Sequence, residues 1–369
     1  MKYYNPVKIS FDTPCGEEIS KLTGTGKKRL IFIYDGFEKS DIFSEITGDG
    51  ENDHIYSDIE ENPSLKSIDK ALRFAKDFKP DFIIAVGGGS VIDTAKVVRY
   101  GLHLNRSSVM ELLEGGITKV SGKRPLLIAV PTTHGTGSEV TMWATVWDKD
   151  KNKKYSVSDP DNYPDHAVYD HRLFSTLPLT VSISSTLDAL SHSFEALWNR
   201  NSNPVSDHFA FESIKLIVKN FSGLEDPVDN RVRIELILAS MYAGLAFSNT
   251  KTAAAHSISY PLTLRYGIPH GIACSMPLFP LLKINSEKMV EKLDRLFMNC
   301  DVKSIEELEE RIKRGVKGKV PFSLEEFGVG EDELDGLVGE SFTKERMANN
   351  IVELSGENVR DILGAIYKQ

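Results

Sequence analysis

The helix-like stretch "TLDALSHSFEALW", Thr186 to Trp198, places an aspartate and a histidine four residues apart. Residues at that spacing share one face of a helix, about 6 Å apart along its axis, so Asp188 and His192 can chelate one metal ion. A hydrogen bond between the two side chains is the commoner use of the same spacing. The pair therefore indicates a metal site only if further ligands exist elsewhere in the chain.

Two more histidines with unusual surroundings follow in the second half of the chain. His256 stands in "TAAAHSISY", and His270 follows a proline in "YGIPHG". An imidazole buried among alanines loses its hydration and finds few polar neighbours, a loss that a bound metal would compensate. With Asp188 and His192 these residues make three imidazoles and one carboxylate, which suit Fe(II) or Zn(II) and leave a position for a substrate oxygen. Taken singly, each histidine is equally compatible with a hydrogen-bonded structural role.

A glycine-rich turn in "DFIIAVGGGSVIDTAK" has the residue types of a phosphate site. Gly87, Gly88 and Gly89 let the backbone approach a ligand without clashes, and Ser90 opens a helix whose free N–H groups attract an anion. A diphosphate would fit there. The spacing is not G-x-G-x-x-G, because Ile92 stands at the last glycine, so a plain turn between strand and helix remains the alternative.

A second turn, "PTTHGTGSEVT", follows the apolar run "LLIAV". The hydroxyls of Thr132, Thr133 and Thr136 could hold a ribose or a ring amide, or could simply cap the loop. Asp35 directly follows an earlier apolar run and is placed like the acid that binds a ribose hydroxyl, which favours NAD over NADP. Its alternative is a plain turn aspartate.

The elements that would position these residues fall into two halves. Continuous apolar runs at 29–34, 81–86 and 126–130 predict parallel strands buried on both faces, and "SLKSIDKALRFAKDFK" has the spacing of a helix between the first two. We therefore predict an α/β dinucleotide-binding domain over residues 1–176. From residue 177 one helical pattern follows another, which predicts an all-helical metal-binding domain over 177–369. A chain of 369 residues suits two domains.

Composition excludes several classes of function. With 53 acidic against 44 basic side chains the net charge is -9, which disfavours nucleic-acid binding. The three cysteines lack C-x-x-C spacing and are typical of a reducing compartment. No apolar run reaches signal-peptide or membrane-spanning length. We expect a cytoplasmic protein without a membrane partner.

Four motifs in this order, "GGGSVIDTAK", "PTTHGTGSEVT", "DALSHSFEA" and "HSISYPLTLRYGIPHG", resemble the iron-containing (group III) alcohol dehydrogenases, and the resemblance covers nearly the whole chain. It implies the dehydroquinate synthase-like fold, with a Rossmann-like α/β domain, a helical domain and a homodimer. It carries the metal ligands onto Asp188, His192, His256 and His270. The cofactor residues it implies are Asp35, Gly87, Gly88, Gly89, Ser90, Asp93, Thr132, Thr133, Thr136 and Lys154, the last at the family's lysine after a β-hairpin.

The activity implied by the resemblance is hydride transfer between NAD(P)H and a small aldehyde, or between NAD(P) and a primary alcohol, with Fe²⁺ or Zn²⁺ as Lewis acid. His270 is expected to be essential as a ligand. Many members carry a second histidine four residues after the third ligand, whereas this chain has Tyr260, which becomes the candidate proton relay. Lys251 stands where the common pattern is rich in glycine, and we include it among the catalytic candidates.

Within the family, "ALWNRNSNPVSD" and "KTAAAHSISYPLT" look most like the phosphonoacetaldehyde reductases, which make 2-hydroxyethylphosphonate. A phosphonate dianion needs cations, and Lys251, Arg265 and His134 are the candidates. One alternative is a diol or lactaldehyde dehydrogenase without an anion pocket. Two others are a dehydroquinate synthase-like lyase and a non-catalytic nucleotide-binding protein. Net consumption of NADH with an aldehyde separates the reductase from both of these.

Overall fold

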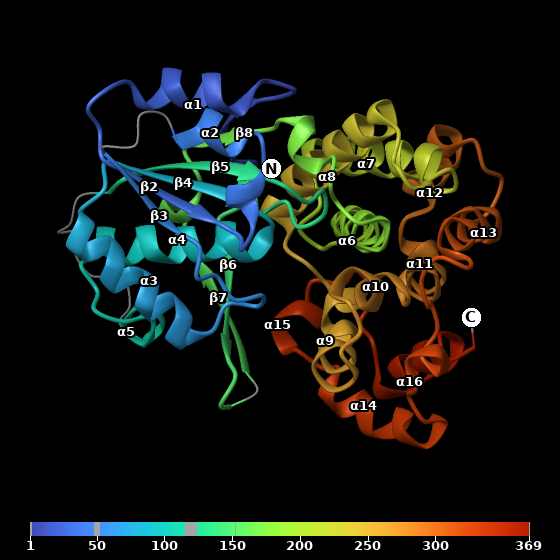
Figure 1. Ribbon diagram of the computed structural model, residues 1–369. Coiled ribbons are helices and arrows are strands. Elements are labelled where there is room, and N and C mark those ends of the chain that lie inside the picture. Colours follow the sequence, from blue (N-terminus) through green and yellow to red (C-terminus); the bar gives the residue numbers. More distant parts are fainter. Residues whose placement is uncertain (1, 48–51, 115–123, 152, 369) are drawn as a thin grey trace. The chain divides into compact units, whose positions relative to one another are not determined.

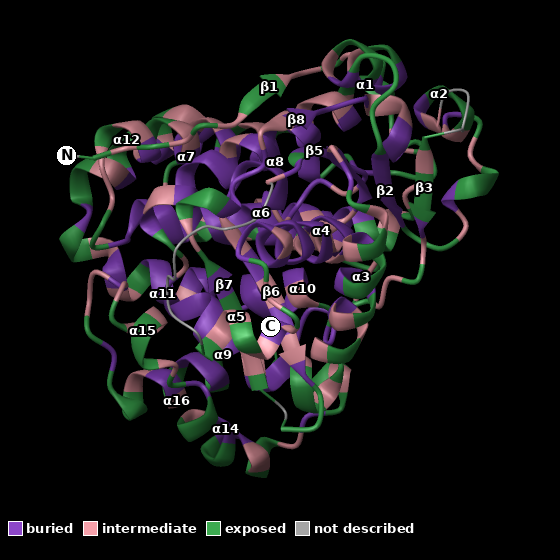
Figure 2. Cartoon of the chain, turned by 90° about the vertical axis from the view of Figure 1, so that its left-hand side faces the viewer, coloured by how far each residue is buried: buried purple, intermediate pink, exposed green. Residues whose placement is uncertain are grey.

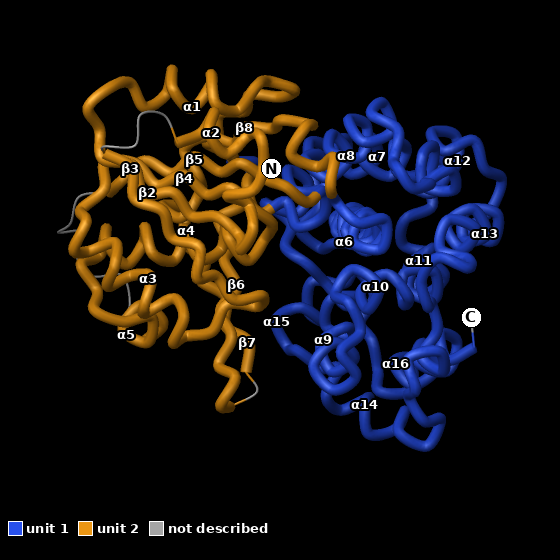
Figure 3. Tube along the Cα trace, in the orientation of Figure 1, with its two compact units in different colours: residues 1–4, 134–137, 177–369 blue, residues 5–133, 138–176 orange. Residues whose placement is uncertain are grey.

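The structure is a computed structural model that describes residues 2–47, 52–114, 124–151 and 153–368. The chain forms two compact units (Figure 3). Unit 2 holds residues 5–133 and 138–176, and unit 1 holds residues 1–4, 134–137 and 177–369. The segments 1–4 and 134–137 thus pack with the helical unit, although our sequence-based division assigned them to the first domain.

Unit 2 is built on a six-stranded parallel sheet in the order β1-β8-β5-β4-β2-β3. Helices lie on both of its faces, with α1 and α2 on one and α3 and α4 on the other (Figure 1). The sheet strands are β1 (Lys8–Ser10), β2 (Arg29–Ile33), β3 (Asp53–Tyr56), β4 (Phe82–Gly87), β5 (Leu126–Pro131) and β8 (His166–Val168). A separate antiparallel hairpin pairs β6 (Trp143–Asp148) with β7 (Lys153–Ser158). The helices are α1 (Cys15–Thr23), α2 (Phe43–Thr47), α3 (Leu65–Phe78), α4 (Gly89–His103) and α5 (Val109–Glu114).

The three central strands, β2, β4 and β5, are those that the continuous apolar runs predict. Leu30 and Phe32 point into the core shared with α3 and α4, while Ile31 and Ile33 are equally buried on the opposite face. Because both faces are covered, these strands show no polar alternation. The expected helix is α3, which Ser64 caps by accepting a hydrogen bond from the Ser67 N–H.

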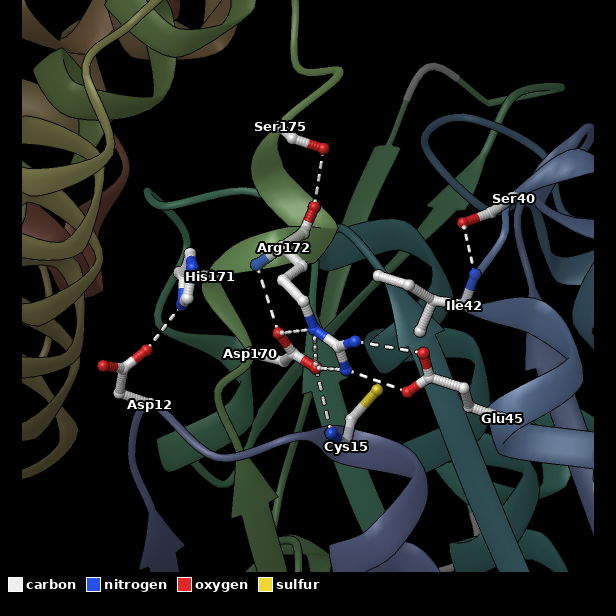
Figure 4. Close-up of polar contacts among 9 residues, drawn as sticks. All are labelled: Asp12, Cys15, Ser40, Ile42, Glu45, Asp170, His171, Arg172 and Ser175. Carbon is white, nitrogen blue, oxygen red and sulfur yellow. Dashed lines mark hydrogen bonds and ion pairs between the residues drawn. The ribbon is translucent and has the colours of Figure 1, made fainter.

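A polar network fixes the 3₁₀ helix at His171–Phe174 to the first helices of unit 2 (Figure 4). Asp170 accepts a hydrogen bond from the Cys15 N–H at 2.9 Å and thereby caps α1. The Arg172 guanidinium binds both Asp170 and, through two nitrogens, the carboxylate of Glu45 on α2. These contacts satisfy the charges of all three side chains, so the network serves the fold of unit 2.

Unit 1 is helical, as the succession of helical patterns predicts. Its helices are α6 (Leu179–Leu197), α7 (Pro204–Phe221), α8 (Asn230–Thr250), α9 (Ala254–Tyr266), α10 (His270–Ser275), α11 (Leu278–Asn285), α12 (Val290–Cys300), α13 (Ile305–Val316), α14 (Leu334–Glu340), α15 (Lys344–Met347) and α16 (Gly356–Ala365). Helix α6 is buried at every residue from Thr186 to Leu197, and it runs through the interior of unit 1 (Figure 2). Polar residues on α6 are therefore desolvated and need partners.

All three cysteines, Cys15, Cys274 and Cys300, are free and buried. Among the helices that the structure describes, none combines the length and the apolar character that a membrane crossing requires.

Candidate metal and cofactor sites

Asp188 on α6 lies at the centre of the three predicted histidine ligands in unit 1. Its Oδ1 is 3.6 Å from Nε2 of His256 on α9, 3.8 Å from Nε2 of His192 and 3.9 Å from Nε2 of His270, the first residue of α10. The same ring nitrogen of each imidazole faces the carboxylate. Three helices thus bring together residues that are up to 82 positions apart in the chain, from Asp188 to His270.

These distances are too long for hydrogen bonds but suit ligands around one ion. A metal bound at about 2.1 Å to each atom in tetrahedral geometry would separate oxygen and nitrogen ligands by roughly 3.4 Å. Moreover, Nε2 of His256 is buried and has no hydrogen-bond partner among the described residues. A buried imidazole nitrogen without a partner is costly unless a ligand takes its lone pair. The donor set therefore fits a divalent metal.

Asp188 and His192 already have the charge of metal ligands, whereas His256 holds an additional proton. Burial lowers the pKa of His192 to about 4, so this imidazole is neutral at pH 7, as a metal ligand must be. Burial would raise the pKa of Asp188, but the surrounding imidazoles outweigh it and hold the pKa well below its usual range. For His256 burial would lower the pKa, but Glu195 and Asp188 together raise it to about 9. A metal must therefore displace a proton from His256.

Glu195 is a functional residue that our sequence analysis missed. It is fully buried on α6, and its Oε2 lies 2.7 Å from Nδ1 of His256. Its Oε1 accepts a hydrogen bond from the His256 N–H at 3.1 Å, at the beginning of α9. The carboxylate thus holds the proton on Nδ1 and directs Nε2 toward Asp188, the usual arrangement of a second-layer carboxylate. Its signal was the i, i+4, i+7 spacing of Asp188, His192 and Glu195 on one helix face.

Cys274 also lies at the cluster, although our sequence-based predictions assigned it no role. Its Sγ is 3.5 Å from Asp188 Oδ1, and one potential ligand atom from each of Asp188, His256, His270 and Cys274 lies within 4.8 Å of the others. His192 is outside that tighter group, although it contacts Asp188. The missed signal was the four-residue spacing from His270 to Cys274 on α10, the same spacing that selects Asp188 and His192.

The segment 134–137 packs against α6 and α8 within unit 1 and includes two of the predicted residues, His134 and Thr136. A Cβ on Gly135 would lie 2.7 Å from the Ser185 carbonyl oxygen, so only glycine permits this approach. His134 is buried and contacts the Ser182 hydroxyl through Nε2 at 3.0 Å. Burial lowers its pKa to about 4. Burial thus favours the neutral form of His134, and its role as a substrate-binding cation stays a prediction.

The first glycine-rich turn has the geometry of an anion site in unit 2. Strand β4 ends at Gly87, Gly88 precedes α4, and the 15-residue helix begins at Gly89, with Ser90 in its first turn. The free N–H groups of this helix end face the region beyond the sheet's carboxyl edge. A Cβ on Gly87 would lie 2.4 Å from the Val91 side chain, which explains the need for glycine there.

The other predicted cofactor residues of unit 2 follow neighbouring strands. Gly87 on β4 pairs with Pro131 on β5, which places Thr132 and Thr133 beside the first turn. The Thr133 side chain lies 3.3 Å from where a Cβ of Gly88 would stand, so the two turns touch. Asp35 is exposed shortly after β2, on the other side of β4. Three adjacent parallel strands thus present these residues at one edge, where α/β sheets bind nucleotides.

Asp93 and Lys96 on α4 fix the second turn of this edge. Asp93 accepts hydrogen bonds from the Ser138 hydroxyl at 2.6 Å and from the Thr145 N–H at 2.8 Å. Lys96 is fully buried and donates to Ser138 Oγ at 3.0 Å and to the Trp143 carbonyl at 2.8 Å. Burial lowers the pKa of Lys96 to about 8. Asp93 therefore positions the loop and the hairpin in this structure, with Lys96 as a partner that our sequence analysis missed.

Lys154 lies inside the hairpin and not after it, which corrects the expected position. It pairs with Trp147 across β6 and β7, and its Nζ is 5.3 Å from the centre of the Trp147 ring. Burial raises the pKa of Asp93, and the positive charge of Lys154 is one of the weaker influences that oppose this rise. The lysine is thus oriented by an aromatic face on the neighbouring strand.

The predicted substrate and relay residues occupy different settings within unit 1. Arg265, near the end of α9, is bound by Glu340 at 3.1 Å and Glu333 at 3.3 Å, so its charge is already compensated on the surface. Tyr260 is half-buried one helical turn after His256, and burial raises its pKa to about 12. Lys251 is exposed at the end of α8, with φ 71° and ψ 171°. Arg265 is thus paired with two carboxylates, and its role in binding an anionic substrate stays a prediction.

Known proteins similar to this chain agree with the geometry. Residues 6–171 match the family model described as iron-containing alcohol dehydrogenase, and residues 182–367 match that of its C-terminal domain. A 4-hydroxybutyrate dehydrogenase of Clostridium kluyveri is 31% identical over 98% of both chains. An iron-containing alcohol dehydrogenase of Thermotoga maritima has 28% identity and a TM-score of 0.84 over 99% of both chains.

A further solved structure is that of a sulfoacetaldehyde reductase from Bifidobacterium kashiwanohense in complex with NAD⁺. It has 26% identity and a TM-score of 0.83, and the match covers 100% of this chain and 99% of that chain. Both family models and relatives matched over nearly their full length agree with the metal cluster and with the glycine-rich nucleotide edge. The chain belongs to the family of iron-containing alcohol dehydrogenases, enzymes that use a divalent metal and NAD(P).

Proposed function

We propose that the protein reduces a small aldehyde with an anionic group at its other end, with phosphonoacetaldehyde as the first candidate and NAD(P)H as the reductant. In this proposal Asp188, His192, His256 and His270 hold Fe²⁺ or Zn²⁺. When bound, the metal supplies a Lewis acid for the carbonyl oxygen and the nicotinamide supplies the hydride. Glu195 keeps His256 in the tautomer that such a ligand needs.

Tyr260 is the proposed proton donor to the product oxygen. It lies one turn from His256 on α9, so both side chains share a helix face. Because burial raises its pKa to about 12, the phenol keeps its proton at neutral pH and can donate it as the alcohol forms. No covalent intermediate with the protein is required.

The observation that best supports an anionic substrate is the backbone conformation of Lys251. Its φ of 71° and ψ of 171° lie in a region that is essentially restricted to glycine and costs other residues about 1–3 kcal/mol. The chain keeps a lysine here, between α8 and the helix of His256 and Tyr260. Strain of this kind is often retained at functional sites, and a cation fits an anionic substrate.

Two relatives support this substrate class. The name of one, 4-hydroxybutyrate dehydrogenase, specifies a carboxylate-bearing alcohol, and that of the other, sulfoacetaldehyde reductase, a sulfonate-bearing aldehyde. A phosphonate, a sulfonate and a carboxylate all present oxygens that Lys and Arg bind. Both names support an anionic headgroup on the substrate, and the preference for a phosphonate rests on the sequence resemblance.

A diol or lactaldehyde dehydrogenase is the second candidate. It is favoured by the neutral His134 and by Arg265, whose charge Glu333 and Glu340 already compensate. Both observations weaken the case for an anion pocket that contains these two side chains.

An initial-rate panel separates the two candidates. Protein reconstituted with Fe(II) or Zn(II) is assayed with NADH and with NADPH against phosphonoacetaldehyde, sulfoacetaldehyde, succinate semialdehyde, lactaldehyde and propanal. Our proposal predicts a higher kcat/KM for at least one anionic aldehyde than for propanal, with phosphonoacetaldehyde highest. A preference for lactaldehyde or propanal would favour the second candidate instead.

A further inference from the structure

Arg346 on α15 is a guanidinium that the sequence analysis did not single out. Its Cζ lies 4.7 Å from the centre of the Tyr260 ring. Within the described ranges it forms no salt bridge with a carboxylate, in contrast to Arg265, which binds two on the far end of α9. Arg346 is half-buried, so its charge is only partly hydrated. A cation in this setting is available to an anion that enters beside Tyr260.

The segment that bears Arg346 is fixed to the helix of the metal ligand His256. The Ser257 hydroxyl donates to the Ser341 carbonyl at 2.6 Å and accepts from the Thr343 N–H at 2.8 Å. Further along, the Asn349 side chain donates to the Thr252 carbonyl at 2.8 Å. These bonds attach both flanks of α15 to residues adjacent to His256 and to Lys251. Figure 1 shows α15 beside α9.

The spacing suits a short bifunctional substrate. His256 and Tyr260 are one turn apart, about 6 Å along α9. The Arg346 guanidinium lies over the ring of Tyr260, the residue one turn after the ligand candidate His256. In a short substrate, the carbonyl group held at the cluster and an anionic group two or three bonds away are separated by a distance comparable to this one-turn spacing. The aromatic face orients the guanidinium through a cation–π contact, while its N–H groups stay able to bind oxygens.

We propose that Arg346, held over Tyr260, binds the phosphonate, sulfonate or carboxylate group of the substrate and thereby sets the preference for an anionic aldehyde. This inference rests on the proposed function and adds its recognition residue. Arg346 donates two parallel N–H···O bonds to the oxyanion, and Lys251 contributes a second positive charge near the start of α9. Bidentate contacts of this type give both affinity and a fixed orientation.

The test compares Arg346→Gln and Arg346→Lys with Lys344→Gln, a control that removes an equal charge from an exposed position of the same short helix. The kcat/KM values are measured for phosphonoacetaldehyde and for propanal, with methylphosphonate as a competitive inhibitor. We expect Arg346→Gln to lower kcat/KM for the anionic aldehyde by about 10- to 100-fold, mainly through KM, and to weaken inhibition by a similar factor. Because Arg346 contacts Tyr260, propanal reduction should also fall in Arg346→Gln, but by a smaller factor, so that the ratio of the two kcat/KM values drops. Lys344→Gln should change neither value by more than about threefold. Arg346→Lys should fall between wild type and Arg346→Gln, because it keeps the charge without the paired donors.

Equal losses for both aldehydes in Arg346→Gln, or an unchanged preference, would overturn the assignment of Arg346. If the Gln variant does not fold, the Lys variant decides by the same ratio of the two kcat/KM values. The failure of the proposed function looks different. In that case the wild-type protein itself would show no preference for any anionic aldehyde, whereas an incorrect role for Arg346 leaves a wild-type preference that the variants retain.

Discussion

Replacing Glu195 by glutamine tests whether this carboxylate controls the metal site through His256. The two side chains have nearly the same shape, but glutamine offers one acceptor where Glu195 accepts from both Nδ1 and the backbone N–H of His256. If the amide nitrogen faces Nδ1, the imidazole must carry its proton on Nε2, which blocks the lone pair that a metal needs. We therefore expect metal affinity to fall about 10- to 100-fold. At tenfold per 1.4 kcal/mol, this corresponds to about 1.4–2.8 kcal/mol.

The assay titrates metal-free protein with Zn(II) against a chromophoric chelator. Glu139→Gln provides a matched control, because Glu139 is also a buried glutamate but bonds to Tyr169 within unit 2. Both variants should lose about 1–3 kcal/mol of unfolding free energy without metal, since each leaves a buried partner poorly satisfied. Only Glu195→Gln should also lose metal affinity. A folded Glu195→Gln protein that binds Zn(II) as tightly as wild type would refute our reasoning.

Three further predictions concern proton competition, backbone strain and the buried thiol. Because Glu195 and Asp188 raise the pKa of His256 to about 9 against the effect of burial, metal binding below that pH must release the imidazole proton. The apparent Kd should fall about tenfold for each unit of rising pH, and a Kd that stays constant from about pH 6 to about pH 8 would contradict this. Lys251→Gly should raise the unfolding free energy by about 1 kcal/mol, since relief of about 1–3 kcal/mol of strain exceeds the entropic cost of glycine. Lys251→Ala should not gain stability, and both variants should raise KM for the anionic aldehyde more than for propanal. A Lys251→Gly protein less stable than wild type would argue against backbone strain at this position. Equal changes in KM for the two aldehydes would argue against a role of Lys251 in binding the anionic group. For Cys274, whose Sγ lies 3.5 Å from Asp188 Oδ1, burial and the Asp188 carboxylate raise the thiol pKa, so we expect Co(II)-loaded protein to lack a thiolate-to-cobalt charge-transfer band. A wild-type band that Cys274→Ser loses would instead make Cys274 a ligand.

The central part of the α/β unit was predictable because its strands are buried on both faces. Strands β2, β4 and β5 are continuous apolar runs, whereas β1 and β8 have only three residues each and β3 lies half-exposed at the sheet edge. Short and edge strands have too little apolar periodicity to be recognised. The hairpin strand β6 does alternate between buried and half-buried residues, but only the family resemblance, and not this periodicity, led us to expect a hairpin.

For the site, ligand types and spacing indicated Asp188, His192, His256 and His270, and the structure brings their side chains together. Glu195 and Cys274 were missed, although both continue a helical spacing from a named ligand. Arg346 carries no local signal, because its position beside Tyr260 depends on the hydrogen bonds that fix residues 341–349 to α9. Contacts between distant segments of this kind follow from tertiary packing and not from sequence periodicity.

The most direct test of a metal-dependent reductase follows NADH oxidation with phosphonoacetaldehyde while metal is removed and restored. Wild-type protein stripped by a chelator should be inactive and should recover on addition of one equivalent of Fe(II) or Zn(II). The His270→Ala variant should remain folded, bind no stoichiometric metal and stay inactive. A metal-free His270→Ala protein with full activity would contradict our central claim.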